Sequence, residues 1–470
     1  MTVRSCWLNF CVVVVALAQS PLVSAEDSKP TRPNIIFILA DDFGIPGVGC
    51  YGGNHKTPNL DALAKGGTRF ESCFSAPLCG PTRAMLMTGR YAFRTGMLTN
   101  GTGAAVTPDR EVTIAKLLKQ AGYSTAVAGK WGQLQYFRSK EDGQRWGFDE
   151  FMIWGGGGGA KALEEEADDA PKKNKPKKQA KLEAKAKGER YWEPSYNHNG
   201  KKLTDVEGKY GPDLLHNFVI DFIERHREGP FFVYYPTPLI HGPILKTPDT
   251  NETGKRQSHY EDNIAYLDKL VGKLVAELDR LKLRDNTLIV FTGDNGSTEA
   301  GTINGRKVDG RKSNLLEGGS RVPLIVNWPG VTPAGVLRKD LVDFSDLFPT
   351  FAEVAGAKLP KGVTIDGHSF AAAIKGEKGQ PRDWVYVQLG EKRYVRDAGW
   401  KLNNDGEFFD MHDAPFAQTA VTKPTAESKA AREKLQAALD RLIEEDKETA
   451  APTIDKKVKA VVTLEFHVEK

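Results

Sequence analysis

Oxygen-bearing side chains end two apolar runs of this 470-residue chain, and their types indicate a metal site. Asp41 and Asp42 end one run, and Asp294 and Asn295 end the other. If both runs are parallel strands, their carboxyl ends meet at one edge of a sheet, where four oxygen ligands can converge. Such ligands suit a hard cation, Ca²⁺ or Mg²⁺, far better than zinc. Each pair taken alone favours solvated acids that cap turns, whereas the two pairs together at two strand ends favour the metal.

A cysteine at the start of a short predicted helix is the second chemical feature. Cys79 precedes Gly-Pro-Thr-Arg, and Pro81 suits the first turn of a helix. Free N–H groups at a helix N-terminus favour negative charge, so this position predicts either a lowered thiol pKa or a bound anionic substrate. Arg83, one turn further on, can reach the same point. A buried structural thiol and a surface ion pair are the alternatives for Cys79 and Arg83.

Apolar runs alternate with helical patterns along most of the chain. Residues 57–67 carry Thr57 as a predicted cap, proline at the first helical position and glycines at the end. Residues 264–281 carry an apolar stripe at spacings of three and four. The predicted strands lie within 32–44, 231–243 and 287–296, and the predicted helices lie within 57–67 and 264–281, with a helix followed by a strand in 112–132.

This alternation predicts an α/β fold with a large, doubly wound, mostly parallel sheet flanked by helices. The functional site should lie at the carboxyl ends of its strands. After about Val354, short apolar runs and an amphipathic stretch at 430–447 predict a smaller antiparallel sheet and a helix. We therefore expect a main domain over 33–356 and a smaller C-terminal subdomain over 357–470.

Two segments fall outside this pattern. Residues 1–25 have a basic start, an apolar stretch too short to span a membrane and a small-residue cleavage site. They predict a cleaved signal peptide, and hence an exported protein, periplasmic or secreted, without a membrane span. Residues 155–190 contain almost no large apolar side chains, so they predict a flexible charged insertion, with a polybasic docking arm as the alternative.

Charge and cysteine content narrow the functional class further. The net charge is +4, and the segment 160–190 has ten lysines and arginines against seven acids, so the remainder is nearly neutral. This balance gives no sign of a nucleic-acid-binding face. Removal of the signal peptide leaves three cysteines, an odd number that indicates at least one thiol with a chemical role. Cys50 and Cys73 could pair with each other, or each could be a small buried apolar side chain.

Several of these motifs together resemble the sulfatase family. Cys-Gly-Pro-Thr-Arg at 79–83, followed by AMLMTGR, is similar to the signature of arylsulfatase-like, formylglycine-dependent sulfatases of the alkaline-phosphatase superfamily. The runs NIIFILADD, TLIVFTGDNG and LLEGGSRVPLIVNWPG match in the same order, and FFDMHDAPF matches in the smaller subdomain. The resemblance covers about residues 33–356.

The resemblance implies hydrolysis of an aryl or carbohydrate sulfate monoester to an alcohol and inorganic sulfate. A separate maturation enzyme would oxidise Cys79 to formylglycine, whose hydrate attacks sulfur with one hydroxyl and expels sulfate with the help of the other. The implied partners are therefore a sulfated small molecule or glycan and the maturation enzyme. The implied cofactor is Ca²⁺.

The resemblance also implies a role for each site residue. As matches to family positions, Arg83 supports the hydrated aldehyde, Lys130 and Lys312 bind sulfate, and His241 acts at the leaving oxygen. On the residues alone, surface lysines and a hydrogen-bonding loop histidine are the alternatives. The implied metal ligands are Asp41, Asp42, modified Cys79, Asp294 and Asn295.

Two departures from the family pattern bear on activity. Thr82 stands where serine is usual, which keeps a hydroxyl. Gly132, followed by Gln133, stands where the family commonly has a histidine that helps to expel sulfate. Either another group substitutes, the rate is lower, or the substrate class differs. A phosphomonoester or phosphodiester hydrolase on the same scaffold and a weakly active protein that binds sulfated glycans are the alternative functions.

Overall fold

The computed structural model describes residues 32–132, 134–154, 181, 184, 187–251 and 258–449. The predicted signal peptide, Gln133 and most of the predicted insertion therefore lie outside the described residues. None of the helices described has the length and apolarity needed to cross a bilayer.

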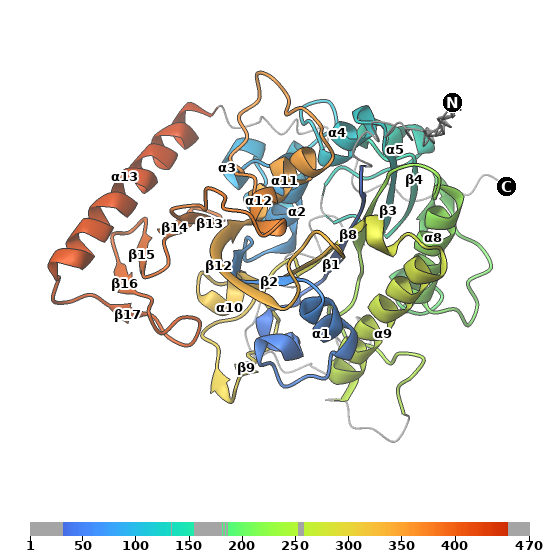
Figure 1. Cartoon of the computed structure of the whole chain (residues 1–470), viewed down its shortest axis with the longest axis horizontal. Helices are drawn as coiled ribbons and strands as arrows, with labels where there is room; N and C mark the ends of the chain where they lie inside the picture. The colour runs from blue at the N-terminus through green and yellow to red at the C-terminus, as the bar shows by residue number, and fades with distance from the viewer. Residues whose placement is uncertain are drawn as a thin grey trace, which may run out of the picture. The chain divides into compact units, whose positions relative to one another are not determined.

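Ten strands form the main sheet (Figure 1). They are β1 (Asn34–Ala40), β2 (Thr68–Phe74), β3 (Ser124–Lys130), β4 (Glu150–Trp154), β5 (Asn197–His198), β6 (Lys201–Lys202), β7 (Phe231–Pro236), β8 (Thr287–Gly293), β11 (Arg321–Asn327) and β12 (Val336–Asp343). Their order is β12-β2-β11-β8-β1-β7-β3-β4-β5-β6. The central strands β8, β1, β7, β3 and β4 are parallel, so the prediction of a mostly parallel sheet is confirmed.

Strand β11 is the exception that matters for the site. It runs antiparallel to both of its neighbours, β8 and β2. As a result β2 is parallel to the central strands, and the beginning of β11 lies at the same edge as their carboxyl ends. Loops after β1, β2, β3, β7 and β8, and the loop before β11, can therefore meet at one edge.

Helices cover both faces of the sheet, and the alternation of side chains along β1 explains why. Ile35, Phe37 and Leu39 belong to the apolar core on one face, whereas Ile36 and Ile38 belong to the core on the other face. In Figure 1, helices α2, α4 and α11 lie on one side of the sheet, and helices α1, α8 and α9 lie on the other. The helices are α1 (Pro58–Lys65), α2 (Cys79–Thr88), α3 (Ala92–Thr95), α4 (Ile114–Gln120), α5 (Lys140–Trp146), α8 (Gly211–Arg225), α9 (Ser258–Arg280), α10 (Glu317–Ser320), α11 (Leu347–Val354), α12 (Ala371–Ile374) and α13 (Ala426–Glu448).

Helix α9 confirms the predicted apolar stripe but begins earlier than the pattern indicates, at Ser258. Its residues Ile264, Leu267, Val271 and Leu274 are buried against α1, α8 and the sheet. The charged residues before Ile264 extend the helix without adding to the stripe, which is why apolar spacing alone misses this first turn.

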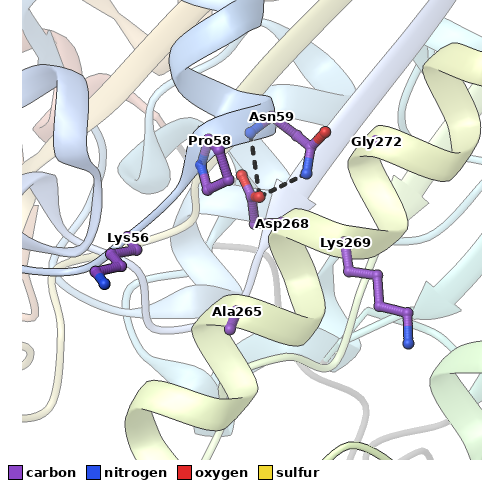
Figure 2. A pocket seen from close by; sticks show the side chains of 7 residues that line it. All are labelled: Lys56, Pro58, Asn59, Ala265, Asp268, Lys269 and Gly272. Carbon is purple, nitrogen blue, oxygen red and sulfur yellow. Dashed lines mark hydrogen bonds between the residues drawn. The ribbon is translucent and has the colours of Figure 1, made fainter.

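The predicted Thr57 cap of α1 is wrong in its detail. Thr57 occupies the capping position, but its side chain makes no cap hydrogen bond and donates to Asp61 instead. Asp268 of α9 takes over this role: its carboxylate accepts from the backbone N–H groups of Asn59 and Leu60, at 3.1 and 2.8 Å, and from the Asn59 amide at 2.7 Å. Figure 2 shows the two hydrogen bonds between Asp268 and Asn59, where α9 lies beside the start of α1.

A separate five-stranded antiparallel sheet lies in the C-terminal part of the chain, as predicted. It consists of β13 (Val385–Leu389), β14 (Lys392–Arg396), β15 (Trp400–Asn403), β16 (Phe408–Asp410) and β17 (Thr419–Ala420), in that order. Helix α13 packs on this sheet through Leu435, Leu439 and Leu442, which confirms the amphipathic helix predicted there. The domain boundary after residue 356 stays a prediction.

The possible Cys50–Cys73 disulfide is not formed. Both residues are separate thiols in the part of the chain that the structure describes. Cys73 lies on β2 inside the core of one sheet face, and Cys50 packs against the core of the opposite face. The sheet therefore separates the two sulfur atoms.

We expect Asp268→Ala to lower the free energy of unfolding by about 1–2 kcal/mol, the usual cost of losing a helix cap. The physical reason is that two backbone N–H groups at the start of α1 lose their acceptor. Urea unfolding measures the change, with Lys269→Ala as the neighbouring control, because Lys269 caps no helix and contacts Asp249 at the surface and the Tyr266 ring. Equal stabilities of the two variants would contradict the capping role.

Candidate active site

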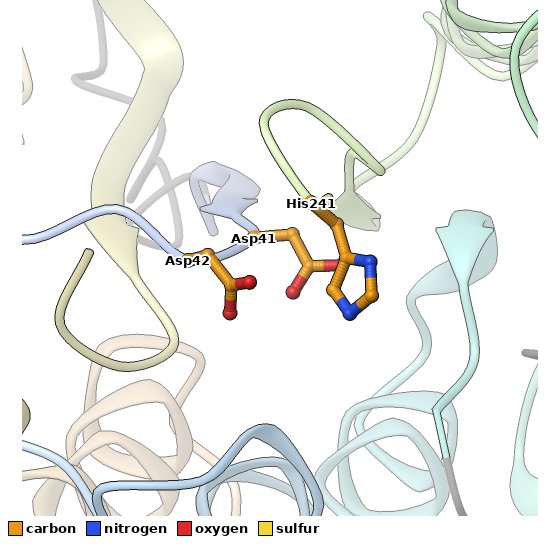
Figure 3. Close-up of side chains that lie close together, drawn as sticks. All are labelled: Asp41, Asp42 and His241. Atoms are coloured by element: carbon orange, nitrogen blue, oxygen red, sulfur yellow. The ribbon is translucent and has the colours of Figure 1, made fainter. Parts of the chain in front are cut away.

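The predicted metal-binding acids lie together at the edge of the main sheet. Asp41 and Asp42 follow β1, and Asp294 follows its neighbour β8, so parallel pairing brings the three carboxylates together. The backbone N–H of Asp42 donates to Asp294 Oδ1 at 2.9 Å, and Asp42 adopts a left-handed conformation with φ 60°. All three side chains are buried. Figure 3 shows Asp41 and Asp42 with His241, which comes from the loop after β7.

Each of these carboxylates has a close cationic partner, and Asp41 also lies 3.7 Å from the Arg83 guanidinium. Asp294 Oδ2 is 2.7 Å from the Arg83 guanidinium, and Asp41 Oδ2 is 2.8 Å from Lys130 Nζ. Asp42 Oδ1 is 2.8 Å from Lys312 Nζ. Three buried negative charges are thereby matched by three positive charges, which is the condition under which buried ions are tolerated.

The pKa values of these groups reflect burial and the neighbouring charges. Burial raises the pKa of Asp42, but Lys312 and His241 outweigh this effect and hold the pKa below its ordinary value. Burial and the nearby Asp41 carboxylate raise the pKa of Asp294. Burial lowers the pKa of Lys130, but Asp41 outweighs it and the pKa is raised, so Lys130 stays cationic.

Cys79 is the first residue of α2 and is buried beside this cluster. Lys130, Lys312, Asp294 and Asp41 are all close enough to act on its thiol. The prediction of a lowered thiol pKa is wrong, because desolvation by burial is the largest effect and raises the pKa above its ordinary value. An unmodified Cys79 is therefore a poor thiolate nucleophile.

Lys312 reaches the site from a loop that the second sheet supports. Because β11 begins at this edge, the residues before it stand over the strand ends. Lys401 of β15 donates to Leu315 O at 2.6 Å, and Tyr394 of β14 bonds with Ser320 at 2.9 Å between their hydroxyl groups. The smaller sheet therefore helps to place Lys312, although none of its own residues is among the predicted site residues.

His241 lies close to the acids and has a defined ring orientation. Its ring and the carboxylates of Asp41 and Asp42 each offer a ligand atom within 4.8 Å of the others. His241 Nδ1 is 2.7 Å from Gly242 O, and because a carbonyl can only accept, Nδ1 carries the hydrogen in this contact. Burial and then Lys130 lower the pKa of His241 well below its ordinary value. The imidazole is therefore neutral, with Nε2 available for a proton.

The residues around the acids fit a hard cation. Asn295 is fully buried, and its Nδ2 group donates to Asp42 Oδ1 at 2.9 Å. Its carbonyl oxygen, Oδ1, accepts no hydrogen bond from any residue that the structure describes. A buried amide oxygen without a donor costs free energy unless a cation or water satisfies it. With the carboxylates beside it, it forms an oxygen-rich set of ligands suited to Ca²⁺ or Mg²⁺.

Gly132 has a conformation that explains the missing histidine. Its φ is +93°, a region that L side chains rarely adopt. A β-carbon built there lies 2.9 Å from Arg83 Cδ, so any side chain needs Arg83 to shift. Because Arg83 pairs with Asp294, the glycine is part of the packing around the site.

Some residues at the site escaped the sequence analysis. The side-chain oxygen of Asn100, Oδ1, accepts from the Gly80 N–H at 2.9 Å and lies 3.6 Å from Cys79 Sγ. Tyr234 on β7 is in hydrogen-bond contact with Arg83 at 3.4 Å. Asn100 stands in a glycine-rich turn and Tyr234 in an apolar strand, so nothing in their local sequence marks them.

The arrangement suits an anionic ester with a tetrahedral centre. Two lysines and an arginine converge where oxygen ligands can hold a divalent cation, and such groups stabilise the charge that develops when a phosphate or sulfate ester is cleaved. The site thus belongs to the class of phosphate and sulfate ester hydrolases.

Comparison with known families decides between these esters. The family model Sulfatase matches residues 33–357, and the chain belongs to the sulfatase family. A model described as N-sulphoglucosamine sulphohydrolase, C-terminal, matches residues 310–444, which include the second sheet.

Individual relatives agree with this assignment. Arylsulfatase D of Homo sapiens is 30% identical over 453 residues, covering 81% of this chain and 74% of its own. N-acetylgalactosamine-6-sulfatase of Canis lupus familiaris is 33% identical over 383 residues, covering 76% and 69%. Among solved structures, Ps i-CgsB superposes with a TM-score of 0.71 at 29% identity over 93% of this chain and 98% of its own.

We expect Gly132→His to lower turnover of an aryl sulfate, although it restores the residue common in the family. The new side chain costs about 1–2 kcal/mol at this backbone conformation and displaces Arg83. Sulfate release and thermal unfolding measure the two effects, and Gly132→Ala is the control for the β-carbon alone. Faster turnover in Gly132→His than in the wild type would contradict this explanation.

Proposed function

We propose that this sulfatase cleaves its ester with formylglycine derived from Cys79 and with a bound Ca²⁺. The supporting observation is the placement of Cys79: it is buried at the start of α2, next to Lys130 and Lys312, in a site whose acids are already paired. Since burial raises the pKa of the thiol, a free cysteine suits this position poorly, whereas a hydrated aldehyde brings two hydroxyl groups.

Asp41, Asp42, Asp294 and Asn295 would hold the cation, together with the modified side chain of residue 79. The orphaned Asn295 Oδ1 supports this set. A divalent cation supplies Lewis-acid polarisation of sulfate oxygens when bound. With the cation bound, Asp41 and Asp42 would no longer need Lys130 and Lys312 as counter-charges, and the two ammonium groups would be available to the anionic substrate.

The remaining residues act on the reacting groups. Arg83 is held by Asp294 and by Lys130 O at 2.8 Å, so it can orient the hydrated aldehyde from a fixed position. One hydroxyl bonds to sulfur and gives its proton to His241 Nε2, the bond between sulfur and the ester oxygen breaks, and the leaving oxygen takes that proton from Nε2. The second hydroxyl then loses its proton to water as the aldehyde forms again and the bond from its carbon to the sulfate oxygen breaks. In this proposal Nε2 is the nitrogen of His241 that carries the proton, because Nδ1 is engaged with Gly242 O.

We infer a sulfated carbohydrate as the substrate class, with an aryl sulfate as the simplest alternative. The relative named N-acetylgalactosamine-6-sulfatase and a solved complex of Ps i-CgsB with k-i-k-neocarrahexaose, at 27% identity, support it. Partners of this proposal are the sulfated substrate and the formylglycine-generating enzyme. Export to a periplasm or out of the cell follows from the predicted signal peptide.

Intact mass of the tryptic peptide FESCFSAPLCGPTR, residues 70–83, tests the central step. From a host with the maturation enzyme, we expect one thiol replaced by an aldehyde at Cys79, with Cys73 unchanged as an internal control. Cys79→Ala should abolish release of sulfate from 4-nitrophenyl sulfate, because the nucleophile is lost. Two intact thiols in an active protein, or faster cleavage of 4-nitrophenyl phosphate, would overturn the proposal.

Removal of the cation should abolish turnover, and added Ca²⁺ should restore it. Binding to the folded state alone also stabilises it, by about 2.7 kcal/mol at a concentration 100 times the dissociation constant. Thermal unfolding with and without Ca²⁺ therefore gives a readout independent of activity. We expect Asn295→Ala to reduce this stabilisation, and an Asn295→Ala protein stabilised as strongly as the wild type would contradict its place among the ligands.

A further inference from the structure

The loop that carries His241, residues 237–246, is held by three consecutive side chains from another part of the chain. Arg190 donates to Gly242 O, and the Tyr191 hydroxyl contacts His241 O at 2.7 Å and Pro238 O at 3.1 Å. Trp192 Nε1 donates to Lys246 O at 2.8 Å. Four backbone carbonyls of one short loop therefore have their donors in residues 190–192.

Gly242 O links Arg190 directly to the imidazole. The same carbonyl accepts from His241 Nδ1 and from the Arg190 guanidinium. Whatever fixes this carbonyl also fixes the direction of the imidazole ring and leaves Nε2 as the nitrogen that can transfer a proton. Arg190 thus acts on His241 through the backbone of the next residue.

Arg190 is itself held in place by aromatic packing. Its guanidinium lies 4.8 Å from the ring centre of Trp154 and 5.3 Å from that of Tyr191, and the residue is only 5% exposed. Trp154 also contacts His241, with ring centres 6.2 Å apart at an edge-to-face angle of 68°. Glu189 lies 3.7 Å from the Arg190 guanidinium, beyond hydrogen-bond distance. A buried arginine without a close carboxylate is better explained by its carbonyl and aromatic contacts than by an ion pair.

We infer that Arg190 and Tyr191 are positioning residues that aim His241 at the leaving oxygen and so decide how well this sulfatase expels poor leaving groups. The inference rests on the proposed function, in which the neutral Nε2 of His241 takes the proton of the attacking hydroxyl and passes it to that oxygen. A phenol with strongly electron-withdrawing groups leaves as an anion without help, whereas a sugar alcohol or a simple phenol needs protonation. The two residues would therefore matter most for carbohydrate sulfates.

The test compares two aryl sulfates on the same protein, 4-nitrophenyl sulfate with a good leaving group and phenyl sulfate with a poor one. For Arg190→Met and Tyr191→Phe we expect kcat/KM for phenyl sulfate to fall about tenfold or more, and that for 4-nitrophenyl sulfate to change less than about threefold. Arg190→Lys, which keeps one donor for Gly242 O, should recover part of the loss. Trp192→Phe is the matched control, since it removes a donor from the far end of the same loop, at Lys246.

The outcomes separate this inference from the proposed function. If His241→Ala lowers both rates equally, His241 does not act at the leaving oxygen, and both its role in the proposed function and the positioning role are overturned, while the peptide mass still tests the formylglycine. If His241→Ala is selective for phenyl sulfate but Arg190→Met and Tyr191→Phe lower both rates equally, the proposed function stands and the positioning role is overturned. A loss of selectivity in Trp192→Phe as large as in Tyr191→Phe would also overturn it, because general loosening of the loop would then explain the effect.

Discussion

The balance of charge among buried groups is the constraint on which the site depends. Three buried carboxylates each have a cationic partner: Asp41 pairs with Lys130, Asp42 with Lys312 and Asp294 with Arg83. Removing one partner of a buried pair costs about 3–5 kcal/mol, so the cluster is stable only when complete. The same pairing keeps Lys130 charged and holds both lysines at the edge of the sheet where the acids lie.

The topology of the main sheet makes this balance possible. Parallel pairing of β1 with β8 and β7 places the acids and the His241 loop at one edge, and β3 ends there with Lys130. Because β11 runs antiparallel to β8, the loop before β11, which carries Lys312, lies at the same edge. A sheet with β11 parallel would send that loop to the far side, and Asp42 would lack its counter-charge.

Much of this could be predicted from the sequence because the signals are local. Strand runs that end in acids, an apolar stripe at helical spacing and a proline behind Cys79 each reflect the physical preferences of a few neighbouring residues. These signals were sufficient for the α/β class, the antiparallel C-terminal sheet and the meeting of acids at strand ends. The motif order from Cys79 to Arg83 and beyond indicated the sulfatase family before any geometry was known.

Other properties depend on residues far apart in the chain, and only the tertiary structure decided them. Helix position alone suggests a reactive Cys79, but burial by the whole site raises its pKa. The sequence shows that Gly132 departs from the family pattern. Only the structure shows why a side chain is excluded there: a β-carbon would lie against Arg83. Arg190 lies 52 residues from the carbonyl it fixes, and no local pattern records that contact. The sequence by itself determined the elements and the chemical groups, because those follow from local preferences; desolvation and long-range contacts, which set how the groups behave, exist only in the folded chain.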